Sequence, residues 1–216
     1  MLFKASSGIK GLDEITGGGL PVGRSTLVCG GPGSGKTMLA VTFLVQGAER
    51  DGEPGVLLSF DESIEEIEVN SRSLGFNLLD LRSRGLLATD HLHIERQEIQ
   101  ETGEYDLEGL FIRLAHAIDQ VKARRVVLDN IDTLFAGIPN QAIPRAELRR
   151  LNLWLKEREL NAIITAERDG DGLTRNGVEE YISDCVIVLE QRVLEELATR
   201  RPVVQSPRAV ARRGAR

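Results

Sequence analysis

The chain has 216 residues and a mass of 23.8 kDa, a length that suits a single α/β domain. Its 41% hydrophobic and 28% charged residues are typical of a soluble globular protein and exclude a disordered one. Two cysteines, Cys29 and Cys185, exclude a disulfide framework, and both lie in apolar runs. We therefore predict two buried free thiols and a cytoplasmic protein.

Charge is unevenly distributed along the chain. Residues 192–216 hold seven arginines and two glutamates, a net charge of +5, which leaves −11 for the rest of a chain whose total is −6. An acidic body and only nine aromatic residues argue against a nucleic-acid-binding face, so only the arginine-rich tail is compatible with such a partner. The longest apolar run has five residues, at 185–189, and we expect no membrane association.

Short apolar runs alternate with longer amphipathic stretches along the chain. Strands are predicted over residues 25–29, 56–60, 92–94, 125–129, 162–165 and 185–189. Helices are predicted over residues 36–50, 63–74, 78–85, 107–122 and 144–159. Ser63 and Glu66 have the spacing of a capping box at the start of the second helix. This alternation predicts an α/β fold with a mostly parallel sheet and helices on both faces.

A phosphate-binding loop lies between the first predicted strand and its helix. Residues 30–37, GGPGSGKT, match the pattern G-x-x-x-x-G-K-[ST] in full. In such a loop the backbone N–H groups and the helix N-terminus face phosphate oxygens. Lys36 supplies a positive charge to the β- and γ-phosphates, and the Thr37 hydroxyl can join a Mg²⁺ shell. The motif predicts nucleotide binding.

Carboxylates follow two of the other predicted strands. Asp129 ends the apolar strand 125–129, where an aspartate can hold Mg²⁺ or simply form a turn; the phosphate loop upstream favours the metal. Asp61 and Glu62 follow the strand 56–60, at the edge where doubly wound sheets bind ligands. One of the two can orient or deprotonate the water that attacks the γ-phosphate, or both can offset the dipole of the next helix.

The sequence resembles the RecA superfamily and, more narrowly, the KaiC family of circadian-clock ATPases. The resemblance covers roughly residues 8–192 and is greatest to the first of that family's two tandem domains. The stretches that carry it include GIKGLDEI at 8–15, GGGLPVGR at 17–24, the phosphate loop, FDES at 60–63, SLGF at 73–76 and GVEE at 177–180.

The resemblance implies a RecA-like P-loop NTPase that hydrolyses ATP with Mg²⁺ at the subunit interfaces of a ring, typically a hexamer. It assigns nucleotide contacts to Gly30, Gly33, Ser34, Gly35, Lys36, Thr37, Met38 and Ser73. It assigns the Mg²⁺ site to Thr37 and Asp129, and catalysis to Asp61 and Glu62. Asp61 departs from the family, which usually has glutamate at that position.

The C-terminus departs further from the family pattern. The predicted elements end near Glu196, and two prolines follow with no helical period. We expect an ATPase domain over residues 1–192 and an irregular or truncated basic tail over residues 193–216. In the family, a strand in this region brings a Lys/Arg pair to the neighbouring subunit's nucleotide, and we expect that strand to be missing.

The function expected from the sequence is a slow Mg²⁺-dependent ATPase that acts as a timing or signalling module, with protein partners of a signalling or clock system. Three alternatives stay open. One is a DNA-acting RecA-type ATPase, another is a regulatory ATP-binding subunit with little hydrolysis, and the third is a Ser/Thr autokinase.

Overall fold

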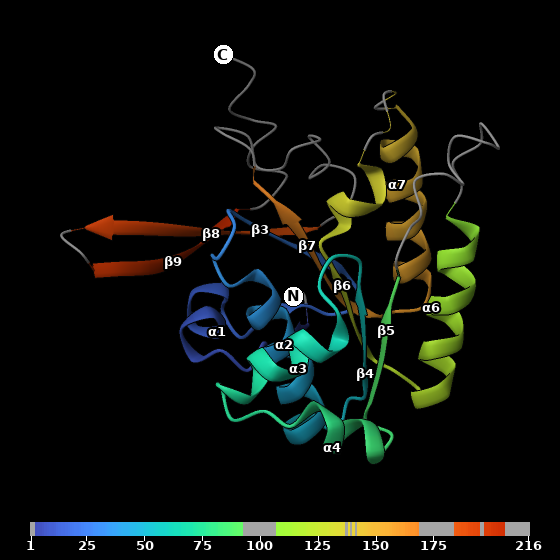
Figure 1. The fold of residues 1–216 in the computed structure, drawn as a ribbon, viewed down its shortest axis with the longest axis horizontal. Coiled ribbons are helices and arrows are strands. Elements are labelled where there is room, and N and C mark those ends of the chain that lie inside the picture. Colours follow the sequence, from blue (N-terminus) through green and yellow to red (C-terminus); the bar gives the residue numbers. More distant parts are fainter. Residues whose placement is uncertain are drawn as a thin grey trace.

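The computed structural model describes residues 3–92, 107–136, 138, 140, 142–168, 184–194 and 197–205. Helices and strands alternate within these ranges (Figure 1). The strands are β1 (Lys4–Ala5), β2 (Leu20–Pro21), β3 (Ser25–Gly30), β4 (Gly55–Ser59), β5 (Leu87–His91), β6 (Arg125–Asp129), β7 (Asn161–Glu167), β8 (Cys185–Leu194) and β9 (Leu197–Gln205). The helices are α1 (Lys10–Thr16), α2 (Lys36–Gln46), α3 (Ile64–Arg72), α4 (Leu78–Ser83), α6 (Glu108–Val121) and α7 (Ala142–Glu157), with a π-helical turn over Gly47–Asp51 and a 3-10 turn over Ile131–Phe135.

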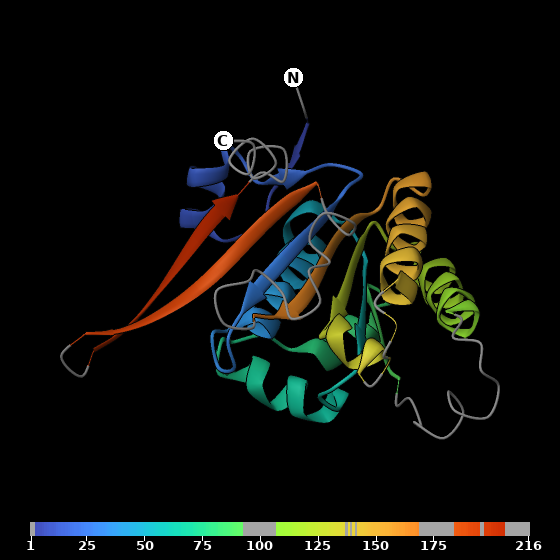
Figure 2. The same ribbon diagram turned by 90° about the horizontal axis from the view of Figure 1, so that it is seen from above.

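A seven-stranded sheet forms the centre of the described part of the chain, in the order β5-β4-β6-β7-β3-β8-β9. All neighbouring strands run parallel except β9, which runs antiparallel to β8. Helices α6 and α7 pack on one face, and α2, α3 and α4 pack on the other (Figure 2). The predicted fold, a mostly parallel sheet with helices on both faces, is confirmed.

The strands are apolar on both sides because both faces of the sheet are covered. In β6, Val126 and Leu128 belong to the core under α6 and α7, whereas Val127 belongs to the core under α2. All three side chains are fully buried. This double burial explains why the predicted strands read as continuous apolar runs rather than as alternating ones.

The prediction of a strand over residues 92–94 is wrong for Leu92, which follows β5 instead of starting a strand; His93 and Ile94 lie outside the described residues. The strand is β5, whose register pairs Leu87 with Gly55 and His91 with Ser59. Its sequence, LATDH, has little β-branched or aromatic character. Pairing with β4 and burial of Leu87 and Ala88 outweigh that weak local preference.

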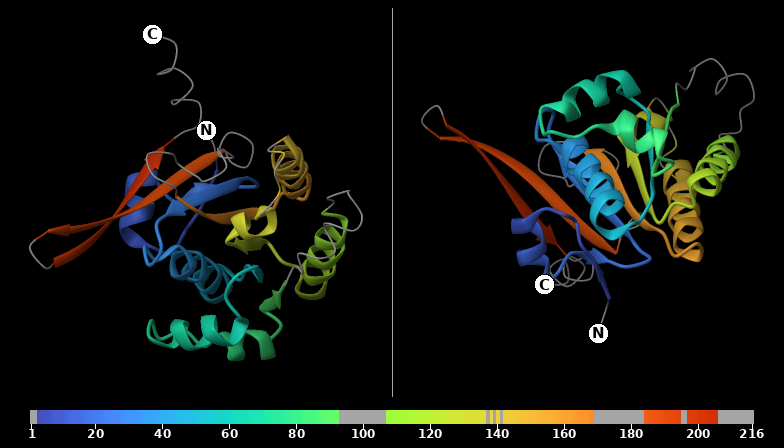
Figure 3. Two further views of the ribbon diagram at one scale, coloured as in Figure 1. Left: turned by 45° about the horizontal axis from the view of Figure 1, so that its top comes forward. Right: turned by 90° about the horizontal axis from the view of Figure 1, so that it is seen from below.

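The prediction that the chain is irregular after about Glu196 is wrong for residues 197–205. These residues form β9, which pairs with β8 from Leu194 opposite Leu197 to Val186 opposite Gln205. The two strands form a hairpin that extends away from the helical layers (Figure 3). Hydrogen bonds of the ladder use the backbone, and an edge strand accommodates a proline such as Pro202, so the composition of the segment misled the prediction. Residues 206–216 lie outside the described residues, and the division at residue 192 stays a prediction.

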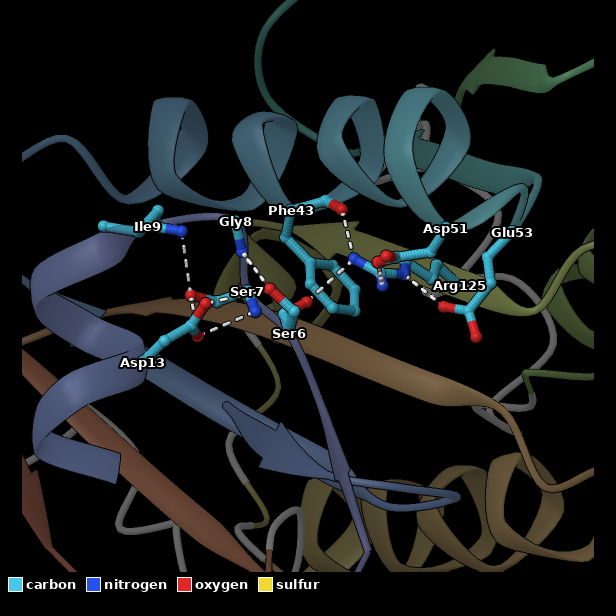
Figure 4. A network of polar contacts seen from close by, with 9 residues as sticks. All are labelled: Ser6, Ser7, Gly8, Ile9, Asp13, Phe43, Asp51, Glu53 and Arg125. Carbon is cyan, nitrogen blue, oxygen red and sulfur yellow. Dashed lines mark hydrogen bonds and ion pairs between the residues drawn. The ribbon is translucent and has the colours of Figure 1, made fainter. Parts of the chain in front are cut away.

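A buried arginine at the start of β6 joins three segments (Figure 4). The Arg125 side chain is 1% exposed and forms ion pairs of 2.6 Å with both Asp51 and Glu53. Its Nη1 donates hydrogen bonds to the carbonyl oxygens of Phe43, at 2.8 Å, and Ser6, at 3.0 Å, and its guanidinium lies over the Phe43 ring. Arg125 therefore fixes the C-terminal end of α2 and the N-terminal segment against the sheet.

Cys29 and Cys185 are buried free thiols, as predicted. None of the helices in the described ranges combines the length and the apolar character that crossing a membrane requires.

We predict that Arg125→Met lowers the free energy of unfolding by about 3 kcal/mol, because it removes the positive charge that neutralises Asp51 and Glu53 and also removes four hydrogen bonds of the guanidinium. Urea unfolding followed by circular dichroism measures the loss. Arg24→Met is the matched control, since Arg24 pairs with Asp184 at side-chain exposures of 29% and 27%. That pair is expected to contribute less than about 1 kcal/mol. Equal losses in the two variants would contradict the role given to Arg125.

Candidate nucleotide site

The predicted site residues gather at the carboxyl edge of the sheet. Register places Ser59 opposite Asp129 and Leu128 opposite Ile164, so the ends of β4, β6 and β7 meet beside the loop that follows β3. A cavity of about 610 Å³ lies there. Its lining consists of Pro32, Gly33, Gly35, Lys36, Thr37, Met38, Asp61, Glu62, Val69, Asn70, Ser73, Leu74, Asp129, Asn130, Thr165 and Glu167.

The phosphate loop owes its shape to glycines. Gly33 and Gly35 have φ angles of +71° and +92°, in the left-handed region that favours glycine. At position 30 glycine is required by space rather than by backbone conformation. A Cβ there would overlap the hydroxyl of Ser34 and approach the carbonyl oxygen of Leu189 at 3.0 Å. Gly30 and Ser34, predicted to contact the nucleotide, are not among the residues that line the cavity, and Ser34 is 3% exposed.

Lys36 lies at the first turn of α2 and folds over the loop. Its Nζ donates hydrogen bonds to the carbonyl oxygens of Gly30, at 3.0 Å, and Gly31, at 3.1 Å. The lysine is therefore positioned at the cavity by its own loop, with its charge beside the N-terminus of α2. A cation beside a helix N-terminus is favourable only where an anion binds between them.

The Asp129 carboxylate joins the ends of three segments. It accepts hydrogen bonds from Thr37 Oγ1, at 3.0 and 3.2 Å, and from Thr165 Oγ1, at 2.7 Å. Asp129 is 2% exposed, and burial raises its pKa, while the two threonines and Lys36 lower it. Within the described residues no Lys or Arg side chain forms an ion pair with Asp129. Such an oxygen-lined, under-compensated carboxylate suits a hard divalent cation.

Asp61 and Glu62 both line the cavity, between the end of β4 and the start of α3. The predicted capping box of Ser63 and Glu66 is confirmed. These two residues cap the N-terminus of α3 without Asp61 or Glu62. Burial raises the pKa of Glu62, and the charges of Asp129 and Asp61 raise it further. A carboxylate with a raised pKa beside a phosphate loop is suited to accept a proton.

Met38 and Ser73 also line the cavity, and the Ser73 hydroxyl donates to the carbonyl oxygen of Asn70. Asn130, Thr165 and Glu167 line the cavity as well and were not among the predicted site residues. Two of these residues could have been found from the sequence. Ligands of open α/β sheets bind at the carboxyl ends of the strands, and this rule, which singled out Asp129, also points to the next residue, Asn130, and to Thr165 at the end of the predicted strand 162–165.

A family model described as "ATPase: KaiC" matches residues 5–212 of the chain. The chain belongs to the KaiC ATPase family. It is 57% identical to circadian clock protein KaiC2 of Synechocystis sp. over 199 residues, 92% of this chain and 35% of that protein. It is 38% identical to circadian clock oscillator protein KaiC of Synechococcus elongatus over 202 residues, 93% of this chain and 39% of that protein.

The resemblance to KaiC proteins seen in the sequence is thus confirmed. The chain spans a little over a third of the length of these curated relatives. The family match extends through β9, the strand that composition alone did not indicate.

We predict that Glu62→Gln raises the thermal midpoint at pH 7. Because the folded-state pKa of Glu62 is raised, ionisation of Glu62 penalises the folded protein at neutral pH. The difference should shrink as the pH falls below the ordinary glutamate pKa, because Glu62 is then protonated in both the folded and the unfolded state. Differential scanning calorimetry across pH measures it.

Glu65→Gln on the exposed first turn of α3 is the control and should not raise the midpoint, because Glu65 favourably faces the helix dipole. A Glu62→Gln midpoint that does not rise at pH 7, or a rise that is independent of pH, would contradict the charge repulsion inferred for the cavity.

Proposed function

We propose that this chain binds ATP with Mg²⁺ and hydrolyses it slowly to ADP and phosphate, as a timing or signalling module of the KaiC type. One observation carries the proposal: a single cavity is lined by Lys36 and Thr37 of the phosphate loop, by Asp129, and by the two carboxylates Asp61 and Glu62. These are the groups that phosphoryl transfer to water requires. Membership of an ATPase family supports the same conclusion.

The loop residues bind the phosphates in this proposal. Backbone N–H groups of the loop and the N-terminus of α2 would face the β- and γ-phosphates. Lys36, already directed at the cavity, adds the positive side chain. Met38 and Ser73 also line the cavity, and in this proposal they contact the rest of the nucleotide.

Thr37 and Asp129 would hold Mg²⁺. Their donors are a hydroxyl and a carboxylate, the oxygen ligands that Mg²⁺ prefers, and the raised pKa of Asp129 shows that its negative charge is poorly compensated without a cation. Bound there, Mg²⁺ would neutralise charge that develops on the phosphates.

Glu62 and Asp61 would act on the attacking water. The half-buried Glu62, with its raised pKa, is the better proton acceptor, and the exposed Asp61 can help to orient the water. In hydrolysis the water oxygen forms a bond to the γ-phosphorus, the bond from that phosphorus to the bridging oxygen breaks, and ADP leaves with the bridging oxygen. The proton of the water passes to the carboxylate.

Two substitutions test the proposal together. Lys36→Ala should weaken ATP binding at least about tenfold in calorimetry, because the backbone amides alone then face the phosphate charge. Glu62→Gln should keep binding and lower phosphate release, because it removes basicity while keeping shape. Lys10→Ala and Glu65→Gln, both exposed and outside the cavity, are the matched controls. Unchanged binding in Lys36→Ala would show that the loop is not the site, and unchanged hydrolysis in Glu62→Gln would remove it from catalysis.

We further propose a cytoplasmic homo-oligomeric ring, hexameric as the family resemblance implies, with clock or signalling proteins as partners. Strand β9 supports this proposal, because it occupies the region where we expected the family's strand to be missing. It carries Arg200 and Arg201, which pair in the ladder with Gln191 and Glu190. An edge strand in the hairpin is suited to reach a neighbouring subunit (Figure 3).

Arg200→Ala and Arg201→Ala test this arrangement. If one arginine reaches the neighbour's nucleotide, its loss should slow ATP hydrolysis by ~10³-fold, the size of an arginine-finger effect. Native mass spectrometry should show that the ring is intact in both variants. Parent-like hydrolysis in both variants, in an intact ring, would contradict a role for β9 across the interface.

A further inference from the structure

Asn130 directly follows Asp129 and has an unusual backbone. Its φ and ψ angles are +60° and +64°, in the left-handed region, where it caps the 3-10 turn Ile131–Phe135. Few residue types adopt this conformation at low cost: glycine does so freely, and asparagine and aspartate are the most tolerant of the others. The backbone therefore favours glycine, asparagine and aspartate at position 130, although lysine and glutamate adopt a similar φ at Lys122 and Glu159.

The contacts of Asn130 distinguish among these three. Its side-chain Nδ2 donates a 3.0 Å hydrogen bond to Oδ2 of Asp61, across the end of the sheet. Because an ionised carboxylate only accepts hydrogen bonds, this contact requires the NH₂ group on that side. Glycine has no side chain to make the bond, and aspartate would place a second carboxylate against Asp61. Of the three, only asparagine supplies a donor.

The backbone of Asn130 is connected, through Thr165, to Asp129 of the proposed Mg²⁺ site. Its N–H donates a 2.7 Å hydrogen bond to Thr165 Oγ1, which in turn donates to Asp129 Oδ1 at 2.7 Å. Asp129 also accepts from Thr37 of the phosphate loop. A continuous series of hydrogen bonds therefore runs from Asp61 to the loop, and Asn130 is the link between the end of β4 and the end of β6.

We propose that Asn130 is a positioning residue that holds the Asp61 carboxylate at the cavity, in fixed relation to Asp129; this rests on the proposed ATP hydrolysis. Asp61 is exposed, and it is one methylene shorter than the glutamate that the family resemblance leads us to expect. A short, exposed carboxylate has no packing to fix its rotamer, so the Asn130 amide supplies the restraint. Misplacement of a reacting group by about 1 Å can lower a rate ~10²-fold.

Asn130→Gly is the decisive variant, because it keeps the left-handed backbone without strain and removes only the amide. We expect calorimetric affinity for a non-hydrolysable ATP analogue with Mg²⁺ to stay within about twofold of the parent. Single-turnover ATP hydrolysis should fall at least about tenfold. In an Asp61→Asn background the same glycine substitution should have no further effect, because the residue that it positions has already lost its charge.

The outcomes separate this inference from the proposed function. A parent chain that does not hydrolyse ATP would overturn the proposed function and this inference with it. A hydrolysing parent matched by Asn130→Gly would overturn the inference alone. An equal loss in binding and hydrolysis, or a full additional loss in the Asp61→Asn background, would show that Asn130 supports the loop rather than Asp61 and would also overturn the inference.

Discussion

The carboxylate of Asp129 accepts hydrogen bonds from the first turn of α2 and from the end of β7, and the candidate site is arranged around it. The parallel register makes this possible, because it brings the carboxyl ends of β4, β6 and β7 to one edge of the sheet. A shift of one residue in β6 would exchange its two faces and carry the carboxylate away from Thr37 and Thr165. The register of the sheet therefore determines where the side chains of the site lie.

The two ends of β6 carry buried charges of opposite sign with opposite surroundings. Arg125, at the start, is paired with Asp51 and Glu53, and its contact with Phe43 anchors the far end of α2 (Figure 4). At the end of β6, the side-chain donors to the Asp129 carboxylate within the described residues are hydroxyl groups, and burial raises the pKa of Asp129. The charge of Arg125 is balanced by its two carboxylate partners, and these ion pairs stabilise the fold. The Asp129 carboxylate has no comparable cationic partner among the described residues, and we propose that a bound divalent cation would supply one, as expected of a functional rather than a structural buried charge.

Features that depend on local pattern could be predicted from the sequence. The phosphate loop, the strand that ends at Asp129 and the capping box at Ser63 each follow from residue type and spacing, and the structure places them as predicted. The strands β5 and β9 could not be predicted in the same way, because both are edge strands held by backbone pairing with one neighbour. Asn130 was missed for a related reason: its partner Asp61 is distant in sequence, and only the register of β4 and β6 brings them together.

We propose that the under-compensated Asp129 carboxylate makes this cavity a site for a nucleotide with a divalent cation. The most direct measurement is calorimetric titration of a non-hydrolysable ATP analogue, with Mg²⁺ and with EDTA, into the parent chain and Asp129→Asn. The parent should bind more tightly with Mg²⁺ by about tenfold or more, equivalent to about 1.4 kcal/mol. In Asp129→Asn the two affinities should become nearly equal. The same dependence on Mg²⁺ in both proteins would contradict the account.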